Sequence, residues 1–231
     1  MITAILLAGG IGSRLDGDIP KQFIEVGDQL VFEYSLKIIL NNEHIANVRI
    51  VAAKNWQVLI EKRVKLLNHS EKFDGFSLPG DTRQLSIYNC LKDIGMGQAE
   101  DLVIVHYAAR PNLNNSLLGN IIEASKGHDG VMPVLPMKDT VYICNKNRRV
   151  AHLLDRNLVF AGQAPELFNL NKYIKANEAI LQDKMKKING ATEPAILAGM
   201  DIVTVLGDEN NYKITTKRDL EEFIAGLSRK D

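Results

Sequence analysis

The sequence predicts an α/β domain in which helices cover both faces of a mainly parallel β-sheet. Apolar runs with the character of strands alternate with amphipathic helical segments along the chain. A chain of 231 residues is long enough for one large domain with a substantial core, so we expect residues 1–231 to form a single domain. Alternation of this kind favours right-handed crossovers, which make neighbouring strands parallel.

Five apolar runs have the length and composition of buried strands. They are Thr3–Leu7, Val48–Ala53, Leu102–Val105, Val131–Val134 and Ile202–Val205. In parallel α/β sheets, ligands bind beyond the carboxyl ends of the strands. We therefore expect the functional residues in the turns that follow these runs.

Three further segments are predicted as amphipathic helices because their apolar residues recur at helical spacing. These residues are Phe32, Leu36, Ile39 and Leu40 in the first segment, Trp56, Leu59, Ile60, Val64 and Leu67 in the second, and Leu220, Phe223, Ile224 and Leu227 in the third. Thr216 and Asp219 have the spacing of an N-terminal cap, which predicts where the third helix begins.

Residues 138–168 interrupt the alternation of strands and helices. Two strand-like pieces, Thr140–Cys144 and Leu158–Ala161, flank a polar tip at Asn145–Arg149. This pattern predicts a β-arm that projects from the domain. The alternative is an ordinary antiparallel edge of the main sheet.

Composition excludes several classes of partner. The chain has 28 Lys and Arg residues and 28 Asp and Glu residues, so no overall field draws it to nucleic acid or to a membrane surface. The sequence shows neither a secretory leader nor an apolar run long enough to span a bilayer. Cys90 and Cys144 are flanked by apolar residues and are predicted to be buried, inert thiols. We expect a cytoplasmic protein.

The turn after the first strand is rich in glycine and is followed by two cations. Glycine lets backbone N–H groups approach a phosphate without interference from a Cβ atom, and successive N–H groups form a concave anion site. The residues of this feature are Ala8, Gly9, Gly10 and Gly12 in the turn, and Arg14 and Lys21 beyond it. The combination indicates a nucleoside triphosphate site, and the alternative is a strand-to-helix turn that binds nothing.

Neither standard nucleotide motif is present in this turn. Leu15 occupies the position of the third glycine of the dinucleotide fingerprint, and the Gly-Lys-Ser/Thr ending of the Walker loop is missing. An NAD-binding oxidoreductase is therefore disfavoured. The segment His106–Arg110 follows another predicted strand, so it lies on the same edge of the sheet as the glycine turn.

Eight motifs in register resemble those of the polyol-phosphate cytidylyltransferases, over about residues 2–226. The motifs are Ala8-Gly9-Gly10-x-Gly12-x-Arg14, Pro20-Lys21-Gln22-Phe23, Gly80-Asp81-x-Arg83-x-x-Ser86, His106-x-Ala108-Ala109-Arg110-Pro111, Asp139-Thr140, Asp155-Arg156-Asn157, Gly162-Gln163-x-Pro165 and Lys213-Ile214-Thr215. The resemblance implies a Rossmann-like nucleotidyltransferase domain, similar to the glycosyltransferase-A fold. It also implies that the chain transfers CMP from CTP to a phosphate monoester, with Mg²⁺ and with release of pyrophosphate.

The resemblance further implies a role for individual residues. Arg14 and Lys21 would hold the triphosphate, and Lys213 would contact the α-phosphate. The cytosine would be recognised by Gly80, Asp81 and Ser86, and the acceptor side would include Tyr107, Arg110, Thr140 and Arg156. In this family Arg156 reaches the site from the arm of a second subunit, so a homodimer is expected. Because the acceptor phosphate is itself the nucleophile, catalysis requires positioning and charge stabilisation rather than a side-chain nucleophile.

Several of these residues have simpler structural interpretations. Arg14 and Lys21 are also compatible with solvated surface charges, Lys213 with an exposed strand residue, and Arg156 with a surface pair with Asp155 or Glu166. Asp81 is also suited to cap the helix that begins near Thr82, a favoured role for aspartate. His106, at the end of an apolar strand, is interpreted as a hydrogen-bonded structural histidine rather than as a catalytic base.

Two positions depart from the family pattern. Tyr107 stands where the family usually has an aspartate, and Glu193-Pro194 stands where it commonly has Asp-Glu. Tyrosine is neutral near pH 7 and is a poor ligand for Mg²⁺. We prefer the interpretation that triphosphate oxygens and water hold the metal. A different phosphorylated acceptor, or a homologue that binds nucleotide with little turnover, would also account for the changes.

Two acceptors are compatible with the motifs, ribitol 5-phosphate and 2-C-methyl-erythritol 4-phosphate. The segments Phe23–Gly27, Gly162–Pro165 and Lys213–Thr216 look more like the ribitol-5-phosphate members. Isoprenoid, wall teichoic acid and capsule synthesis are all compatible pathways.

Overall fold

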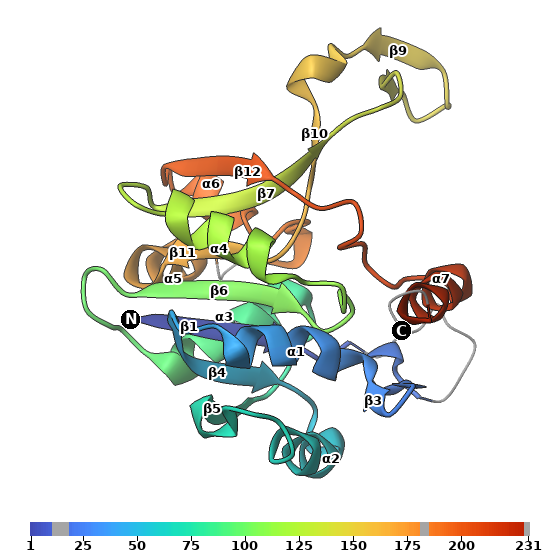
Figure 1. The fold of residues 1–231 in the computed structure, drawn as a ribbon. Coiled ribbons are helices and arrows are strands. Elements are labelled where there is room, and N and C mark those ends of the chain that lie inside the picture. Colours follow the sequence, from blue (N-terminus) through green and yellow to red (C-terminus); the bar gives the residue numbers. More distant parts are fainter. Residues whose placement is uncertain (11–18, 181–184, 229–231) are drawn as a thin grey trace.

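The computed structural model describes residues 1–10, 19–180 and 185–228, and its centre is an eight-stranded sheet (Figure 1). Seven strands follow one another in the order β10-β7-β11-β6-β1-β4-β5, and β12 pairs with β7. The strands are β1 (Ile2–Leu7), β4 (Ile45–Val51), β5 (Phe73–Ser77), β6 (Leu102–Tyr107), β7 (Gly130–Pro136), β10 (Phe160–Gly162), β11 (Glu166–Asn169) and β12 (Ile202–Leu206).

The core of the sheet is parallel, as the alternation predicts. β1 pairs in parallel with β4 and β6, and β4 pairs in parallel with β5. The five predicted strands are β1, β4, β6, β7 and β12, with ends that differ by up to three residues. The sheet is nevertheless mixed, because β11 lies antiparallel between β6 and β7. β5 and β11 are short strands that the pattern of apolar residues did not predict.

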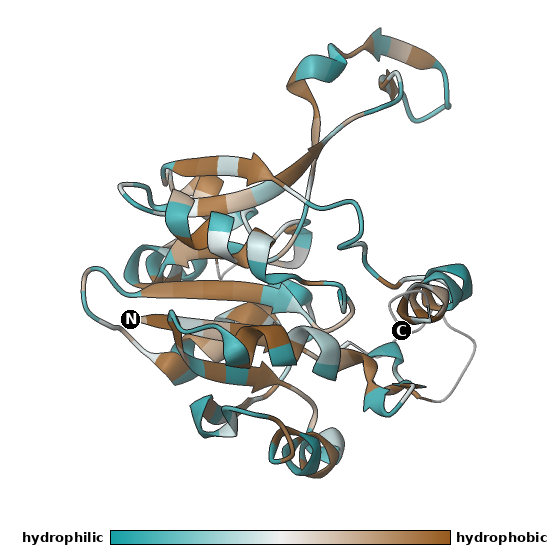
Figure 2. Ribbon diagram, viewed as in Figure 1, coloured by the Kyte–Doolittle hydropathy of each residue, from teal (hydrophilic) through white to brown (hydrophobic). Residues whose placement is uncertain are grey.

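Helices cover both faces of the sheet. They are α1 (Val31–Asn41), α2 (Lys54–Val64), α3 (Arg83–Ile94), α4 (Asn115–Ala124), α5 (Leu170–Glu178), α6 (Glu193–Leu197) and α7 (Lys217–Leu227). Ala4 and Leu6 of β1 pack in the core cluster that contains the apolar residues of α1, α2 and α4, whereas Ile5 packs with α3 and α5. This division follows from the alternation of side chains along a strand. The central strands are accordingly largely brown in Figure 2.

The last helix packs on a smaller cluster beside the sheet. A two-stranded hairpin, β2 (Glu25–Val26) with β3 (Gln29–Leu30), precedes α1. Phe223 of α7 packs against Val26, Val31 and Ile214, and its ring meets that of Tyr34 edge-on at 5.0 Å. Four 3₁₀ turns complete the described structure, at Lys21–Phe23, Ser70–Lys72, Arg156–Leu158 and Met185–Lys187.

A hairpin projects from the end of β7 (Figure 1). Its strands are β8 (Tyr142–Cys144) and β9 (Val150–Leu153), on either side of the predicted polar tip. The second strand of the arm is thus β9 rather than Leu158–Ala161, which overlaps β10. Since β10 and β11 pair with the main sheet, the projecting part of residues 138–168 ends before Phe160.

The arm exposes its apolar side chains. Those of Tyr142, Ile143, Val150, Leu153 and Leu158 are all at least 46% exposed. Cys144 also lies on this hairpin and is exposed, so its predicted burial is wrong in the single chain, whereas Cys90 is buried as predicted. None of the helices in the described segments is long and apolar enough to cross a membrane.

Candidate functional site

A cavity of about 680 Å³ lies at the carboxyl edge of the sheet. It is enclosed by the turn after β1, the segment after β5, the end of β6 and the loop between β12 and α7. The lining includes Gly9, Gly10, Lys21, Gln22, Gly80, Asp81, Thr82, Arg83, Ser86, Tyr107, Ala109, Lys213 and Thr215. Motifs that are up to about 200 residues apart in the sequence therefore meet in one place, as the position of the turns predicts.

The glycine turn is held by a side chain from the following motif. The amide nitrogen of Gln22 donates hydrogen bonds to the carbonyl oxygens of Ala8 and Gly10, each at 2.7 Å. A Cβ atom on Gly9 would lie 2.7 Å from Cβ of Pro79, so glycine is needed for the close approach of the two loops. Gln22 was not singled out as a site residue from the sequence. Gly12 and Arg14, two predicted site residues, lie outside the described residues.

The segment from Gly80 to Ser86 is ordered by its own hydroxyl groups. The Ser86 hydroxyl accepts a hydrogen bond from the Gly80 N–H at 3.0 Å and donates one to the Thr82 carbonyl at 2.9 Å. The cap of α3 is Thr82, whose hydroxyl accepts from the Leu85 N–H at 3.1 Å. Asp81 therefore does not cap this helix. Instead, Asp81 is one of the residues that line the cavity.

Lys213 is brought to the cavity by the loop after β12. The Ile214 N–H donates to the Ala109 carbonyl at 2.8 Å, and the Ile214 side chain is buried. The Asn211 side chain donates to the Ala164 carbonyl at 2.7 Å, so the loop is tied to two segments near the end of the sheet. The Lys213 ammonium lies 4.6 Å from the centroid of the Tyr107 ring.

Arg110 anchors the same loop and is not among the residues that line the cavity. Its guanidinium donates to the Asn211 carbonyl, and burial lowers its pKa. The structure therefore shows a scaffolding contact for Arg110, and its expected place on the acceptor side stays a prediction. Arg110 nevertheless lies next to the cavity lining, because its N–H donates to the Tyr107 carbonyl at 2.9 Å.

Two buried titratable groups lie behind the cavity wall. Nε2 of His106 lies 3.0 Å from the Arg110 carbonyl, and burial lowers the pKa of His106 to about 4, which supports its structural interpretation. Glu166 on β11 accepts a hydrogen bond from the Thr192 hydroxyl at 2.6 Å. Burial raises the pKa of Glu166, while the charges of Arg83 and Arg110 oppose this shift. Glu166 was missed from the sequence because nothing local marks its burial.

The Glu193-Pro194 departure lies outside the cavity. Pro194 is in the first turn of α6, where proline is well tolerated, and it is buried. The Glu193 carboxylate accepts from the Asn189 N–H at 2.7 Å, and Arg83 donates to the Asn189 carbonyl. Both contacts stabilise the segment that supports Arg83.

Thr140 and Arg156 are not among the residues that line the cavity in the single chain. Both belong to the arm and are exposed. The Arg156 guanidinium donates to the Lys138 carbonyl at 3.1 Å, and Asp155 caps the 3₁₀ turn by accepting from the Asn157 N–H at 3.0 Å. Arg156 does not pair with Glu166, because Glu166 is buried in the main sheet.

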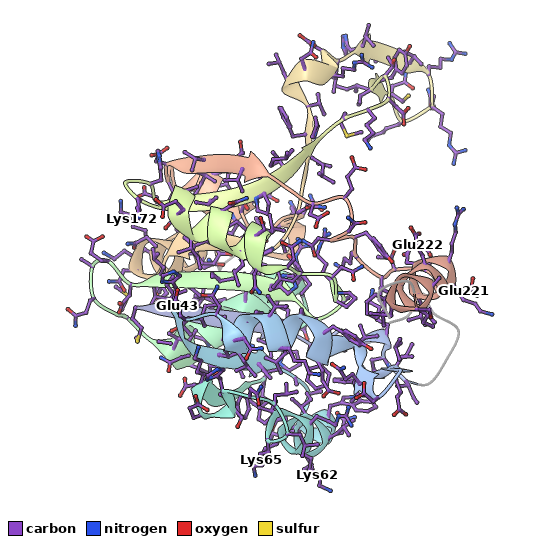
Figure 3. All side chains as sticks on the ribbon, viewed as in Figure 1. Glu43, Lys62, Lys65, Lys172, Glu221 and Glu222 are labelled. Carbon is purple, nitrogen blue, oxygen red and sulfur yellow. The ribbon has the colours of Figure 1, made fainter. Side chains whose placement is uncertain are left out.

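The cavity is strongly cationic. Lys21, Arg83 and Lys213 line it and are half-buried, whereas Asp81 contributes a single carboxylate. Most other charges are exposed, such as those of Lys62 and Lys65 near the end of α2 in Figure 3. Cations held in a partly desolvated hollow suit a polyanionic ligand. Arg83 belongs to one of the family motifs, but the resemblance implies no role for it. Its place at the start of a helix that follows a strand was the local signal that could have predicted a site residue.

The donor set does not form a metal cage. Within the described residues there is no group of three His, Cys, Asp or Glu side chains that could hold a metal ion. Tyr107 lines the cavity, and burial, followed by the charge of Glu166, raises the pKa of its phenol. It is therefore neutral near pH 7 and presents an uncharged ring to the cavity.

Comparison with known families and structures agrees with this geometry. Residues 2–227 match the family model of 2-C-methyl-D-erythritol 4-phosphate cytidylyltransferase. Enzymes of that name from Thermotoga neapolitana and Petrotoga mobilis are 32% and 30% identical to this chain, with 96% of this chain covered in both and 94% and 96% of the relatives.

Solved structures show the same fold. The crystal structure of 4-diphosphocytidyl-2C-methyl-D-erythritol synthase from Anaerococcus prevotii has a TM-score of 0.86 and 25% identity, covering 99% of this chain and 96% of that one. The Francisella tularensis 2-C-methyl-D-erythritol 4-phosphate cytidylyltransferase has a TM-score of 0.79 and 26% identity, covering 96% and 97%.

Proposed function

This chain belongs to the 2-C-methyl-D-erythritol 4-phosphate cytidylyltransferase family, and we propose that it transfers CMP from CTP to a phosphorylated polyol, with release of pyrophosphate. The observation that carries the proposal is the cavity in which Lys21, Arg83 and Lys213 meet the glycine turn. Three cations beside backbone N–H groups suit a triphosphate.

The reaction requires no side-chain nucleophile. An oxygen of the acceptor phosphate attacks the α-phosphorus of CTP, the bond from that phosphorus to the bridging oxygen breaks, and pyrophosphate leaves with the electron pair. Two anions must be brought together, and charge builds up on the leaving group. Lys21 and Lys213, with Arg14, would stabilise this charge, and fixed cations of this kind provide catalysis mainly by electrostatics.

Base recognition is assigned to the segment before α3. The hydrogen bonds between Ser86 and Gly80 hold this segment in place, and Asp81 provides a carboxylate that can accept a hydrogen bond from the cytosine amino group. A site that pairs with one base leaves its polar groups unpaired with another. CTP should therefore bind more tightly than ATP, GTP or UTP.

Magnesium is proposed to enter with the nucleotide. Mg²⁺ keeps several waters and is usually bound through one or two carboxylates together with substrate phosphates. Of the described lining residues only Asp81 carries a carboxylate, which does not suffice to hold the ion without the triphosphate. This arrangement agrees with a neutral residue at position 107.

The acceptor side is proposed to be completed by a second copy of the chain. Thr140 and Arg156 are exposed on an arm whose apolar residues are also exposed. An isolated two-stranded hairpin is marginally stable in water, and a C₂ partner is the commonest way to cover such a surface. In the homodimer the arm would carry Arg156 to the partner's cavity. A cytoplasmic location is part of the same proposal, because CTP is made inside the cell.

The direct test is pyrophosphate release from CTP and Mg²⁺ with a panel of phosphorylated polyols that includes 2-C-methyl-erythritol 4-phosphate and ribitol 5-phosphate. We expect turnover with one of them. The kcat/KM values then identify the preferred acceptor. Calorimetry with the four nucleotides tests base selectivity. CTP binding without turnover for any acceptor would favour the second candidate, a nucleotide-binding homologue, which the neutral Tyr107 supports. Equal affinity for all four nucleotides would contradict the assignment of the cytosine site.

A further inference from the structure

The motif Gly162-Gln163-x-Pro165 has no role in the site described above, although the Gln163 side chain is buried. Gln163 directly follows β10, the strand by which the arm returns to the main sheet. Its backbone N–H donates to the Pro133 carbonyl of β7 at 2.7 Å, which fixes the base of the side chain against the sheet. A buried amide in this place has to find its hydrogen-bond partners within the protein.

The Gln163 amide finds them on the backbone of the loop that carries Lys213. Its nitrogen donates to the Asp208 carbonyl at 2.9 Å, and its oxygen accepts from the Asp208 N–H at 3.0 Å. A Cβ atom on Gly207 would collide with the same oxygen, so glycine permits the close approach. One side chain thus satisfies both backbone groups of Asp208, as a neighbouring strand would.

A second contact joins the same two segments. The Asn211 side chain is fully buried, and its nitrogen donates to the Ala164 carbonyl at 2.7 Å. Lys213 lies two residues beyond Asn211 in the sequence. The base of the arm, at Gln163 and Ala164, therefore holds the loop at two points just before the lysine.

Loss of the Gln163 amide would leave two backbone groups of Asp208 without partners. An unpaired polar group in a buried place costs more than the net gain from a single hydrogen bond, so the loop would move to find other partners. A displacement of about 1 Å in a group that acts on the reacting atoms can cost about 100-fold in rate. The position of Lys213 is thus sensitive to a residue that does not line the cavity.

We infer that Gln163 is a positioning residue: it fixes the loop of residues 207–213 to the base of the arm and thereby sets the place of Lys213 in the cavity. Gln163 acts on the backbone of this loop, independently of the contacts that the Lys213 ammonium makes. This role deepens the proposed function and rests on it for the reaction that Lys213 serves.

Hydrogen exchange of the backbone amides tests the contact without any substrate. Gln163→Met keeps the length of the side chain but has neither amide group. It should speed exchange in residues 207–214 at least about tenfold, because exchange reports the local opening of hydrogen-bonded backbone. Unchanged exchange in residues 207–214 of this variant would overturn the inference.

The matched control is Asn171→Leu. Asn171 on α5 binds the backbone of Gly97 in the same manner, accepting from its N–H at 2.9 Å and donating to its carbonyl at 3.0 Å. Neither residue lines the cavity. This variant should speed exchange near Gly97 and leave exchange in residues 207–214 unchanged, which separates the loop contact from a general loss of stability.

Steady-state pyrophosphate release with CTP and the preferred acceptor measures the consequence for Lys213. Gln163→Met should lower kcat at least about tenfold and leave the acceptor KM within about threefold of the wild type, because the displaced group stabilises the transition state. Asn171→Leu should retain the kcat of the wild type. A Gln163→Met variant with a lower thermal midpoint but an unchanged kcat would have lost only a structural contact, and this result would overturn the inference.

A double-mutant cycle with Lys213→Ala shows whether Gln163 acts through the lysine. In that background Gln163→Met should change kcat by less than about twofold, because the two residues act as one unit; equal effects in both backgrounds would overturn the inference. Gln163→Glu keeps the acceptor oxygen and is the second variant in case Gln163→Met does not fold, with the same directions expected. Failure of the proposed function appears separately, as no pyrophosphate release by the wild type, and exchange in residues 207–214 then still decides whether Gln163 fixes the loop.

Discussion

The lysines of the cavity lie next to residues that hold their segments of the chain in place. Lys21 stands beside Gln22, which orders the glycine turn, and Lys213 stands beside Ile214, whose side chain is buried. In each segment, therefore, one residue has a structural role and its neighbour, the lysine, lines the cavity. Mutations of the lysines should affect chemistry more than folding.

Lys21→Ala and Lys213→Ala should each lower kcat by at least about 100-fold, as expected when a preorganised positive charge is removed from the transition state. Steady-state pyrophosphate release measures the effect, and thermal unfolding should show an intact fold. Lys126→Ala, which removes an exposed partner of Glu123, is the control and should retain full activity. Turnover within a few-fold of the wild type in both cavity variants would contradict the assignment.

His106 makes the stability of the protein sensitive to acid. Its Nε2 faces the Arg110 carbonyl and so carries the proton, while Nδ1 is buried without a hydrogen-bond partner. Protonation would place a charge on that buried atom, which explains why the pKa falls from 6.5 to about 4. Between these values the unfolded chain binds more protons than the folded one, so stability rises with pH.

The contribution of His106 should therefore be lost as the pH falls from about 6.5 to 4, at a cost of about 3 kcal/mol in the free energy of unfolding. Urea titrations at several pH values measure the loss, and His106→Gln should remove this part of the pH dependence. His152→Gln is the control, because His152 is exposed. The same pH dependence in the wild type and in His106→Gln would show that the buried imidazole is not its cause.

Among the elements, α7 connects the site to the small cluster beside the sheet. The Asp219 carboxylate accepts from the N–H groups of Thr215 and Thr216 at 2.7 and 2.8 Å, and the Thr216 hydroxyl accepts from the Asp219 N–H at 3.2 Å. Burial opposes ionisation of Asp219, but hydrogen bonds from Thr215 and Thr216 lower its pKa to about 2. The capping box predicted from the sequence is thus confirmed.

Thr216→Ala should lower the free energy of unfolding by about 1 kcal/mol, because the hydroxyl that satisfies an N-terminal N–H group is lost. Denaturation by urea measures the change, and Thr216→Ser should restore most of it, since serine caps equally well. An alanine variant as stable as the wild type would mean that the cap contributes nothing measurable to α7.

At the scale of the whole molecule, the arm provides the main exposed apolar surface. The apolar groups on β8 and β9 are unusual for a protein that stays monomeric, since exposed apolar clusters generally mark interaction sites. The arm projects beyond the carboxyl end of β7 (Figure 1). Arg156 is not among the residues that line the cavity of its own chain, so we expect it to act in the cavity of a partner.

Analytical ultracentrifugation at micromolar concentration should show a homodimer. The double variant Val150→Asp, Leu153→Asp places charges on the exposed arm and should shift the equilibrium to the monomer, with loss of acceptor turnover and retention of CTP binding. Val58→Asp, on the exposed surface of α2, is the control and should leave the dimer intact. A monomeric wild type would refute the dimer, and Arg156 would then have to act within its own subunit.

The sequence by itself determined the class of fold and the edge at which the site lies. The apolar runs of β1 and β6 and the glycines after Leu7 are local signals, and local propensity and periodicity are sufficient to read them. The family motifs also indicated which residues to expect at that edge of the sheet. The signals for the cap of α7 and for the polar tip of the arm were also local, which is why both features were predicted correctly.

Only the tertiary structure decided how distant segments combine. The insertion of β11 between β6 and β7, the burial of Glu166 and the contact of Tyr107 with Lys213 all depend on pairings between residues that are 36 or more positions apart. No local pattern encodes such a pairing, because its free energy comes from the packing of surfaces that meet only after folding. For the same reason the contact by which Arg110 anchors the loop that carries Lys213 could not be predicted from the sequence.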